Sequence, residues 1–477
     1  MRLQSRSLFA GMAVGLILAL TASSAGAAKS KFTRLQGFKA PGTPAYLNKV
    51  GVLKVGPAAA KNVLVLQPGT SASAAYFRQV ANQIIARANS RAKRIRRPLL
   101  RKRRLWQVWA VERRENLLED HSVYNRQKDR QVTSEQAFDY YLGWINDSSV
   151  TNHIKLIPDE AVPFARKWGM NVAMQDLRRV IRAAGKRGRR VVLGGHSLGG
   201  TMTIAYATWN FGGRSGGRGL SGLVLIDGGS GPGTAPSAAE AQQALTDLES
   251  ESPWLVFGTI PSPFTGLFNT GGALSALIDP NAPSLGQASG LLPASLIPPC
   301  DATNLAQYGY ALDSDTSPPE LAAAQAHLGR LDQSTDPCGW DQAGEITPIQ
   351  RYARLFAGWG LKGLDGTAWY HPMRLTIDGR AVNAGIRNPA QSVLNVRARF
   401  GRRLDFPIYA FEAQLGDGRV VPAARALARQ SGIPRRKLTL VDRSSTYSHN
   451  DPSSAFPANA FVKKLIPFLR KVLRQRR

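Results

Sequence analysis

A glycine-flanked serine is the feature of this sequence whose residue types and spacing could do chemistry. Gly195-His196-Ser197-Leu198-Gly199 follows the apolar run of residues 190–194 and precedes a helical pattern over 199–207. A serine at a sharp strand-to-helix turn has a strained backbone, and small residues two positions away prevent clashes with both elements. The following helix N-terminus places its positive dipole end near a developing oxyanion. The pattern indicates a nucleophile, Ser197; a plain glycine-rich turn is the alternative interpretation.

Short apolar runs alternate with helical patterns on both sides of a central interruption. A compact apolar run bounded by turn residues is typical of a strand buried on both faces of a parallel sheet. The predicted strands are residues 50–55, 62–67, 105–111, 190–194, 222–226, 406–411 and 437–441. Helical spacing appears over residues 74–90, 172–185, 199–207, 421–431 and 459–472. This alternation predicts an α/β fold, with a mostly parallel central sheet and helices on both faces.

The alternation stops between Asp227 and Arg403. Residues 228–300 are rich in Gly, Pro, Ser and Ala, and helical patterns return near residues 237–249, 319–331 and 347–358. We therefore expect a catalytic domain of residues 28–227 plus 403–477, with a large cap or lid insertion of residues 228–402. Apolar residues of this insertion, from Trp254 to Phe268, either line an acyl-chain site or form the core of the cap.

The N-terminus has the pattern of a targeting signal. Arg2 and Arg6 precede an apolar run over residues 8–20, and Ala25-Gly26-Ala27 supplies a cleavage pattern. Residues 1–27 are therefore predicted to be a signal peptide, because the run is shorter than the ~20 residues of a membrane span; an uncleaved anchor is the alternative. We expect a secreted or extracytoplasmic protein of the cell envelope, without a transmembrane segment after signal cleavage.

The chain has two cysteines, Cys300 and Cys338, both in the predicted insertion. An even number of cysteines in an exported protein favours one disulfide, although two unpaired thiols would also fit. Two cysteines alone make a poor metal site, so we expect no bound metal.

The sequence is strongly basic, with 62 Lys and Arg against 32 Asp and Glu and a formal charge of +30. Loss of Arg2 and Arg6 with the signal leaves +28. Nine of the fourteen residues 91–104 are basic, and residues 470–477 form a basic tail. Such charge favours an anionic cell-envelope surface. Specific nucleic-acid binding is not expected, because no recognition motif or interleaved aromatic residues accompany these tracts.

Five motifs in order resemble the α/β-hydrolase superfamily, within its secreted bacterial esterase and lipase branches. They are QPGT (67–70), GGHSLGG (194–200), GLVLID (222–227), the turn around Asp417, and YSHNDP (447–452). The resemblance covers residues 45–227 and 403–475, and it implies a serine–acid–histidine triad without a cofactor. Two departures stand out. Pro68-Gly69 replaces a common His-Gly pair, and the Asp417 turn lacks a D-x-x-V-P spacing.

The resemblance also implies the partners of Ser197. The base belongs in the loop after the last strand, where His449 is the histidine that follows residues 437–441. The acid belongs in the turn after the strand that follows the insertion, where Asp417 is favoured and Glu412 is the next candidate. Asp227 is a third option. The backbone N–H groups of Leu198 and Thr70 are predicted to form the oxyanion hole, and His196 is predicted to pack beneath the serine turn.

Together these features predict an exported serine hydrolase that cleaves carboxylic esters through an acyl-enzyme on Ser197. Lipid esters are among the candidate substrates. The same triad would also serve an amide or peptide hydrolase or an acyltransferase. A non-catalytic, basic envelope-binding protein on a hydrolase scaffold is the remaining alternative.

Overall fold

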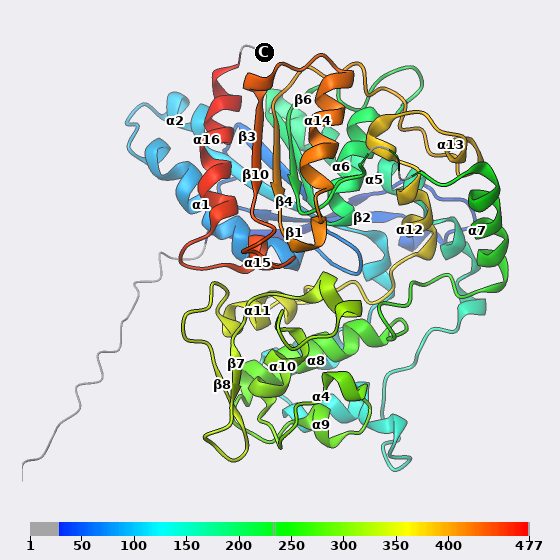
Figure 1. Cartoon of the computed structure of the whole chain (residues 1–477), viewed down its shortest axis with the longest axis vertical. Helices are drawn as coiled ribbons and strands as arrows, with labels where there is room; N and C mark the ends of the chain where they lie inside the picture. The colour runs from blue at the N-terminus through cyan, green and yellow to red at the C-terminus, as the bar shows by residue number, and fades with distance from the viewer. Residues whose placement is uncertain (1–27, 232, 234, 476–477) are drawn as a thin grey trace, which may run out of the picture.

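The computed structural model describes residues 28–231, 233 and 235–475. The predicted signal peptide lies outside these residues. An eight-stranded sheet crosses the upper part of the molecule, and a lobe of helices lies below it (Figure 1). Within the described ranges, no helix combines the length and the apolar character needed to cross a membrane.

The central sheet has the strand order β1-β2-β4-β3-β5-β6-β9-β10. Antiparallel pairing is confined to β1 with β2 and β2 with β4, and all other neighbours are parallel. The predicted mostly parallel sheet is therefore confirmed. The bounds are β1 Ser30–Gln36, β2 Lys49–Val55, β3 Asn62–Gln67, β4 Trp106–Glu112, β5 Arg190–His196, β6 Leu220–Ile226, β9 Ile408–Glu412 and β10 Leu438–Asp442.

Helices cover both faces of the sheet. Alternate residues of its central strands point to opposite faces and are apolar on both, so each face needs a cover. In β3, Leu64 and Leu66 belong to one core, whereas Val63 and Val65 belong to the other. The first core is closed by α1 (Arg78–Lys93) and α16 (Ala460–Arg474), and the second by α5 (Met170–Gly185), α6 (Leu198–Thr208) and α14 (Val420–Gln430). These elements confirm the predicted α/β class.

Strand β1 is an element that the sequence pattern did not predict. It lies at the edge of the sheet, and most of its residues, SKFTRLQ, are exposed or half-buried. An edge strand with one neighbour needs no continuous apolar run, so its sequence resembles an ordinary polar loop.

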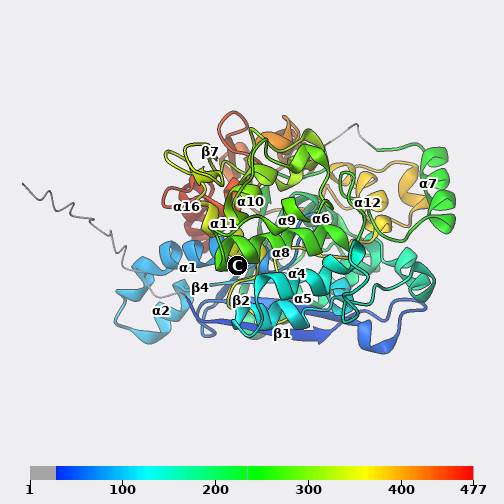
Figure 2. The same ribbon diagram turned by 90° about the horizontal axis from the view of Figure 1, so that it is seen from below.

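The lower lobe combines segments from both sides of Ser197 in the sequence. The first segment holds α3 (Ser122–Lys128) and α4 (Ser134–Tyr141), which both pack on α8. The second segment holds α8 (Phe264–Ile278), α9 (Leu285–Ala288), α10 (Asn304–Leu312), β7 (Arg330–Asp332), β8 (Gly339–Asp341) and α11 (Ile349–Phe356). Seen from below, α4, α8 and α10 lie in front of the sheet (Figure 2).

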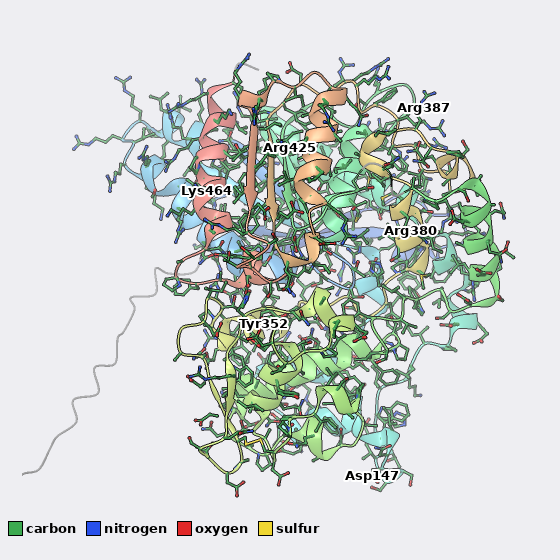
Figure 3. The ribbon with its side chains drawn as sticks, viewed as in Figure 1. Asp147, Tyr352, Arg380, Arg387, Arg425 and Lys464 are labelled. Carbon is green, nitrogen blue, oxygen red and sulfur yellow. A yellow bond between two sulfur atoms is a disulfide. The ribbon has the colours of Figure 1, made fainter. Side chains whose placement is uncertain are left out.

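The rest of the predicted insertion does not lie in the lower lobe. Helix α12 (Met373–Arg380) packs on α5 and α6 (Figure 1). Helix α7 (Ala238–Ser250) packs on α12, and α13 (Ala390–Val393) packs on α7. The predicted helix over residues 319–331 is wrong, because a 3₁₀ turn over Pro319–Ala324 is followed by strand β7. Tyr352 of α11 lies at the junction between lobe and sheet (Figure 3), where its hydroxyl accepts a hydrogen bond from Asn450.

Candidate active site

Ser197 stands at the turn between β5 and α6, with φ 57° and ψ −129°. Positive φ is strained for a residue with a side chain, and such strain persists only where the surroundings impose it. The Ser197 N–H donates to the Ile226 carbonyl of the neighbouring strand at 3.0 Å, and its own carbonyl accepts from Gly200 N–H at 2.8 Å. The backbone on both sides thus holds the serine in this conformation.

Glycines make this turn possible, because backbone segments approach where side chains would clash. A Cβ added to Gly195 would lie 2.0 Å from the Gly199 carbonyl oxygen. One added to Gly199 would lie 2.1 Å from the Gln67 oxygen, and one on Gly228 would lie 1.9 Å from the Ser197 oxygen. Contacts this short exclude any other residue without a backbone shift. The glycine spacing in the sequence therefore reflects close packing among β3, β5, β6 and α6.

His449 lies in the loop after β10 and is buried. Its Nδ1 is 2.6 Å from Asp227 Oδ2. Its backbone carbonyl accepts a hydrogen bond from His196 Nε2 at 2.8 Å. Since Nδ1 is engaged with the carboxylate, Nε2 is the ring nitrogen left to exchange a proton. Ser197 and His449 line the same cavity.

Asp227, at the end of β6, is the carboxylate that the structure brings to His449. Its Oδ1 accepts from the backbone N–H groups of Ala413 at 2.7 Å and Gly416 at 3.0 Å. Burial alone would raise the pKa of Asp227, but the hydrogen bond and charge of His449 and the Ala413 N–H hold it below its usual value. An ionised, fully paired carboxylate stabilises a positively charged imidazole.

The preference for Asp417 as this acid is corrected by the structure. Asp417 is exposed and left-handed, with φ 45°, and makes no contact with His449. Glu412 is buried, but its carboxylate accepts from Val420 and Val421 N–H at the start of α14. The turn after β9 therefore contributes backbone donors to Asp227 instead of a carboxylate of its own.

His196 packs beneath the serine turn, where the sequence placed it. It stacks on Tyr76 with ring centroids 5.1 Å apart and donates Nε2–H to the His449 carbonyl. Burial and the adjacent His449 lower the pKa of His196 to about 3, so this imidazole stays neutral. The Tyr76 hydroxyl donates to Asn450 Oδ1 at 2.7 Å and extends the support to the histidine loop.

The predicted oxyanion donors lie next to the serine. Leu198 is the first residue of α6, and Thr70 borders the same cavity as Ser197. Next to Thr70, a Cβ added to Gly69 would lie 2.8 Å from Ser197 Cβ, so the loop after β3 lies against Ser197. Their donation to an oxyanion stays a prediction.

Two buried side chains that the sequence did not indicate hold this loop. The Arg113 guanidinium donates to the carbonyls of Pro68, Gly69 and Ala72 at 3.1–3.2 Å. His371 Nδ1 accepts from Ser71 N–H at 3.3 Å. Burial, and then the charge of Arg113, lower the pKa of His371 far below its usual value, so it remains a neutral acceptor. The one available signal was the position of Arg113 directly after a buried strand.

A cavity extends from Ser197 and His449 into the lower lobe. Its wall beyond Ser197 and His449 is mainly apolar and is contributed by α3, α4, α8, α10, α11 and their loops. The apolar side chains include Tyr124, Phe138, Leu142, Phe257, Ile260, Phe268, Leu292, Leu296, Tyr308, Leu312, Leu321 and Phe356. Such a wall accepts an apolar substrate chain and excludes water.

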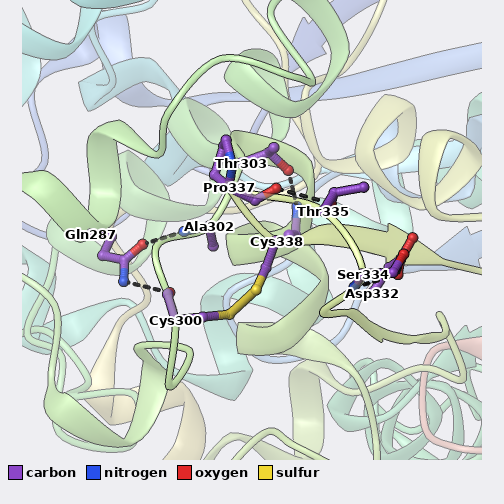
Figure 4. The surroundings of a disulfide bond; sticks show 10 residues. Gln287, Cys300, Ala302, Thr303, Asp332, Ser334, Thr335, Pro337 and Cys338 are labelled. Atoms are coloured by element: carbon purple, nitrogen blue, oxygen red, sulfur yellow. Dashed lines mark hydrogen bonds between the residues drawn. A yellow bond between two sulfur atoms is a disulfide. The ribbon is translucent and has the colours of Figure 1, made fainter.

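The lower lobe also carries the predicted disulfide, Cys300–Cys338, which is confirmed. Figure 4 shows the chain around it. The Gln287 side chain bonds to the segment that carries Cys300: it donates to the Cys300 carbonyl at 2.9 Å and accepts from Ala302 N–H at 2.9 Å. Thr303 N–H donates to the Cys338 carbonyl at 3.0 Å, so the covalent link joins segments that are also paired by backbone hydrogen bonds.

Comparison with known proteins gives structural likenesses only. No family model and no curated protein matches the chain. Among solved structures, it is similar to a Sulfolobus solfataricus protein assigned as a lipase, with 14% identity, a TM-score of 0.46 and 94% of each chain covered.

Two further likenesses cover 93% of this chain and 99% of the other. One is a carboxyl esterase from Bacillus coagulans, with 12% identity and a TM-score of 0.35. The other is a haloalkane dehalogenase from Bradyrhizobium elkani, with 10% identity and a TM-score of 0.38. None of these likenesses supports an argument about chemistry.

The fold assignment rests on the molecule itself. The sheet is mostly parallel, β2 is the antiparallel strand inside it, and a strained serine follows β5 at a strand-to-helix turn. The histidine comes last in the chain, after the final strand. The observed architecture is therefore the mostly parallel α/β sheet with helices on both faces that the sequence pattern predicted.

Proposed function

We propose that this protein is an exported serine hydrolase that cleaves carboxylic esters, with Ser197 as nucleophile, His449 as general base and Asp227 as the orienting acid. One observation carries the proposal. A strained serine and a histidine bonded to a buried carboxylate line the same apolar cavity. A histidine–aspartate pair with a purely structural role needs no cavity beside it, whereas an acyl-transfer site requires a cavity for its substrate.

The geometry supports a proton path through His449. Asp227 holds Nδ1–H, so Nε2 accepts the Ser197 proton as Oγ attacks the ester carbonyl carbon. Leu198 and Thr70 N–H groups stabilise the oxyanion. His449 then protonates the departing alcohol oxygen, and the acyl group stays on Ser197. A water molecule, deprotonated by His449, attacks the acyl-enzyme and releases the acid.

The cavity supports a substrate with a long apolar acyl chain, which includes lipid esters. Gly271 and Gly272 lie inside α8 and line the cavity. Glycine inside a helix costs about 0.5–1 kcal/mol relative to alanine, so two in succession need a reason. A Cβ on Gly272 would lie 3.1 Å from Tyr308 Cδ2, and one on Gly271 would lie 3.0 Å from the Tyr124 hydroxyl. The glycines keep the cavity wide between these rings.

The predicted division into domains is retained as a proposal with one change. Residues 28–227 and 403–477 carry the triad, and the insertion 228–402 supplies most of the cap. The cap that covers the cavity also includes α3 and α4, because both pack on α8 and contribute to the cavity wall. Residues 1–27 are proposed to direct export to the cell envelope, in agreement with the disulfide.

Fluorophosphonate labelling tests the nucleophile directly. We expect the wild type and Ser275→Ala to label and Ser197→Ala to remain unlabelled, because Ser275 also lines the cavity but has no adjacent base. Labelling of Ser197→Ala would disprove the assignment. A wild type that does not label would instead favour the non-catalytic scaffold.

A p-nitrophenyl ester series tests the substrate class. We expect kcat/KM to rise with acyl length until the cavity is filled, and Gly272→Val to lower it for long chains only. Faster cleavage of matched p-nitroanilides would contradict ester specificity and favour amide hydrolysis. Predominant transfer to an added alcohol would favour an acyltransferase.

A further inference from the structure

Helix α2 (Pro98–Arg104) exposes apolar side chains that the fold does not use. None of its residues is buried. Leu99 is 73% exposed and Leu100 is 45% exposed. A seven-residue helix with no buried residue gains little stability from packing, and exposing two adjacent leucine side chains to water costs free energy. Such residues indicate contact with an apolar partner.

The leucines are surrounded by positive charge. Residues 91–104 contain nine Lys and Arg, all exposed, and no Asp or Glu. Among the residues that the structure describes, none of these nine takes part in an ion pair. Unneutralised charge at this density repels itself and is stabilised by an anionic partner.

The positive surface continues from α1 onto α16. The two helices pack against each other, and Lys463 and Lys464 of α16 are exposed. Burial, and next the charge of Arg91, lower the pKa of Arg470, which shows that these two guanidinium groups are close. Residues 91–104 with Lys463, Lys464 and Arg470 are called the α2 surface.

The α2 surface lies apart from the lower lobe. In both views α1, α2 and α16 occupy one side of the molecule, and α8 and α10 of the lobe lie elsewhere (Figures 1 and 2). A partner on this surface therefore leaves the lobe that encloses the cavity uncovered.

We propose that the α2 surface docks the protein on an anionic lipid bilayer. Leu99 and Leu100 insert among the acyl chains, and the surrounding Lys and Arg side chains contact lipid phosphates. The leucines favour a bilayer over a nucleic acid as the partner, because protein surfaces that bind single-stranded nucleic acid combine basic residues with stacking aromatic rings. Residues 91–104 contain no aromatic residue. Docking does not depend on the proposed hydrolysis, since neither Ser197 nor His449 contributes to this surface.

Vesicle co-sedimentation tests the proposal, using the exported chain with Ser197→Ala so that no lipid is consumed. The vesicles are phosphatidylcholine alone or phosphatidylcholine mixed with phosphatidylglycerol. We expect binding to the mixed vesicles that weakens with added salt, as screening shortens the reach of charge. Leu99→Ser/Leu100→Ser should weaken binding roughly tenfold or more, since two inserted side chains are lost.

Charge-removal variants and matched controls test the electrostatic part of the docking. Arg101→Gln/Lys102→Gln/Arg104→Gln should also weaken binding roughly tenfold or more. Arg380→Gln/Arg387→Gln/Arg425→Gln removes the same charge from exposed residues on other elements (Figure 3) and should bind like the parent. Val256→Ser, at a side chain 49% exposed, is the control for the leucines.

Four outcomes would overturn the proposal. Equal binding to both vesicle types would show that charge does not contribute to docking. Unchanged binding of the leucine variant would show that Leu99 and Leu100 do not enter the bilayer. Equal weakening by the two charge-removal sets would show an effect of net charge and not of the α2 surface. Retained binding to single-stranded RNA by the leucine variant, without vesicle binding by the parent, would assign the surface to nucleic acid.

Discussion

The serine turn and the histidine loop meet at one site but are held in different ways. Ser197 is fixed by backbone packing, through glycines within a few residues and through the neighbouring strands. The His449 loop is held largely by its own side chains, those of Asn450 and Asp451, which form hydrogen bonds with the lower lobe. Asn450 N–H donates to the Gln325 carbonyl at 3.0 Å, and Asn450 Nδ2 donates to the Ala323 carbonyl at 3.1 Å.

Asp451 continues this attachment. Its Oδ1 accepts from His327 N–H at 3.1 Å and from the Thr347 hydroxyl at 2.7 Å, and its Oδ2 is 2.6 Å from His327 Nδ1. The lobe therefore helps to hold the His449 loop in place as well as lining the cavity. Damage to the serine turn should affect folding and chemistry together, whereas damage to the lobe contacts should affect mainly the base.

Loss of the acid should have the largest effect on chemistry. Asp227→Asn leaves the shape intact but removes the charge that stabilises the imidazolium and favours the required tautomer. We expect kcat to fall roughly 10⁴-fold. Asp417→Asn is the matched control and should retain the wild-type kcat, because Asp417 is exposed. The reverse pattern would restore Asp417 as the acid.

Damage to the serine turn should be next in size. In Gly199→Ala the new Cβ meets the Gln67 carbonyl oxygen, which is backbone and cannot move aside. We expect a loss of about 4 kcal/mol or more in the free energy of unfolding, measured by urea denaturation. Gly185→Ala is the control, since the nearest atom to its Cβ would be Val191 Cγ2 at 3.7 Å. A fully stable Gly199→Ala would contradict the packing account.

Damage to the histidine loop should be smaller and should separate chemistry from stability. Asn450→Ala removes the bonds to Ala323 and Tyr76 and should cost about 2 kcal/mol of stability. The fluorophosphonate labelling rate should also fall. Asn388→Ala is the control, because Asn388 is not part of the His449 loop and donates to the Ala381 carbonyl. This variant should lower stability without slowing labelling. Equal labelling rates would show that the lobe does not position the base.

The smallest effect is expected from pH at His327. The hydrogen bond from this imidazole to Asp451 raises the pKa of His327 above its ordinary value of 6.5. A raised folded-state pKa stabilises the protein fully below 6.5, and the gain disappears as pH rises through the folded pKa. We expect His327→Gln to lose about 1 kcal/mol at acidic pH and less at alkaline pH, measured by thermal unfolding. A constant difference across pH would exclude this ion pair as the cause.

Local patterns predicted the buried strands and the strand-to-helix turn at Ser197 well, and they predicted poorly where long-range contacts decide. Strand β1 was missed because an exposed edge needs no apolar run. Helix α8 was missed because Gly266, Gly271 and Gly272 lower its helical propensity, while packing on α4, α10 and α11 stabilises it. The disulfide was predicted, because two cysteines in a chain expected to be exported allow one intramolecular pairing.

The sequence by itself determined the strained serine turn, since Gly195 and Gly199 lie two residues from Ser197 and their spacing is visible in one dimension. It also located His449 after the last strand. Only the tertiary structure decided which carboxylate contacts His449. Asp227 and Glu412 lie at strand ends and Asp417 lies in the turn after β9, and which of them reaches His449 depends on how β6, β9 and the final loop meet. Local sequence does not encode that distance, because it is set by the packing of segments more than 180 residues apart, such as Asp227 and Ala413 at a separation of 186.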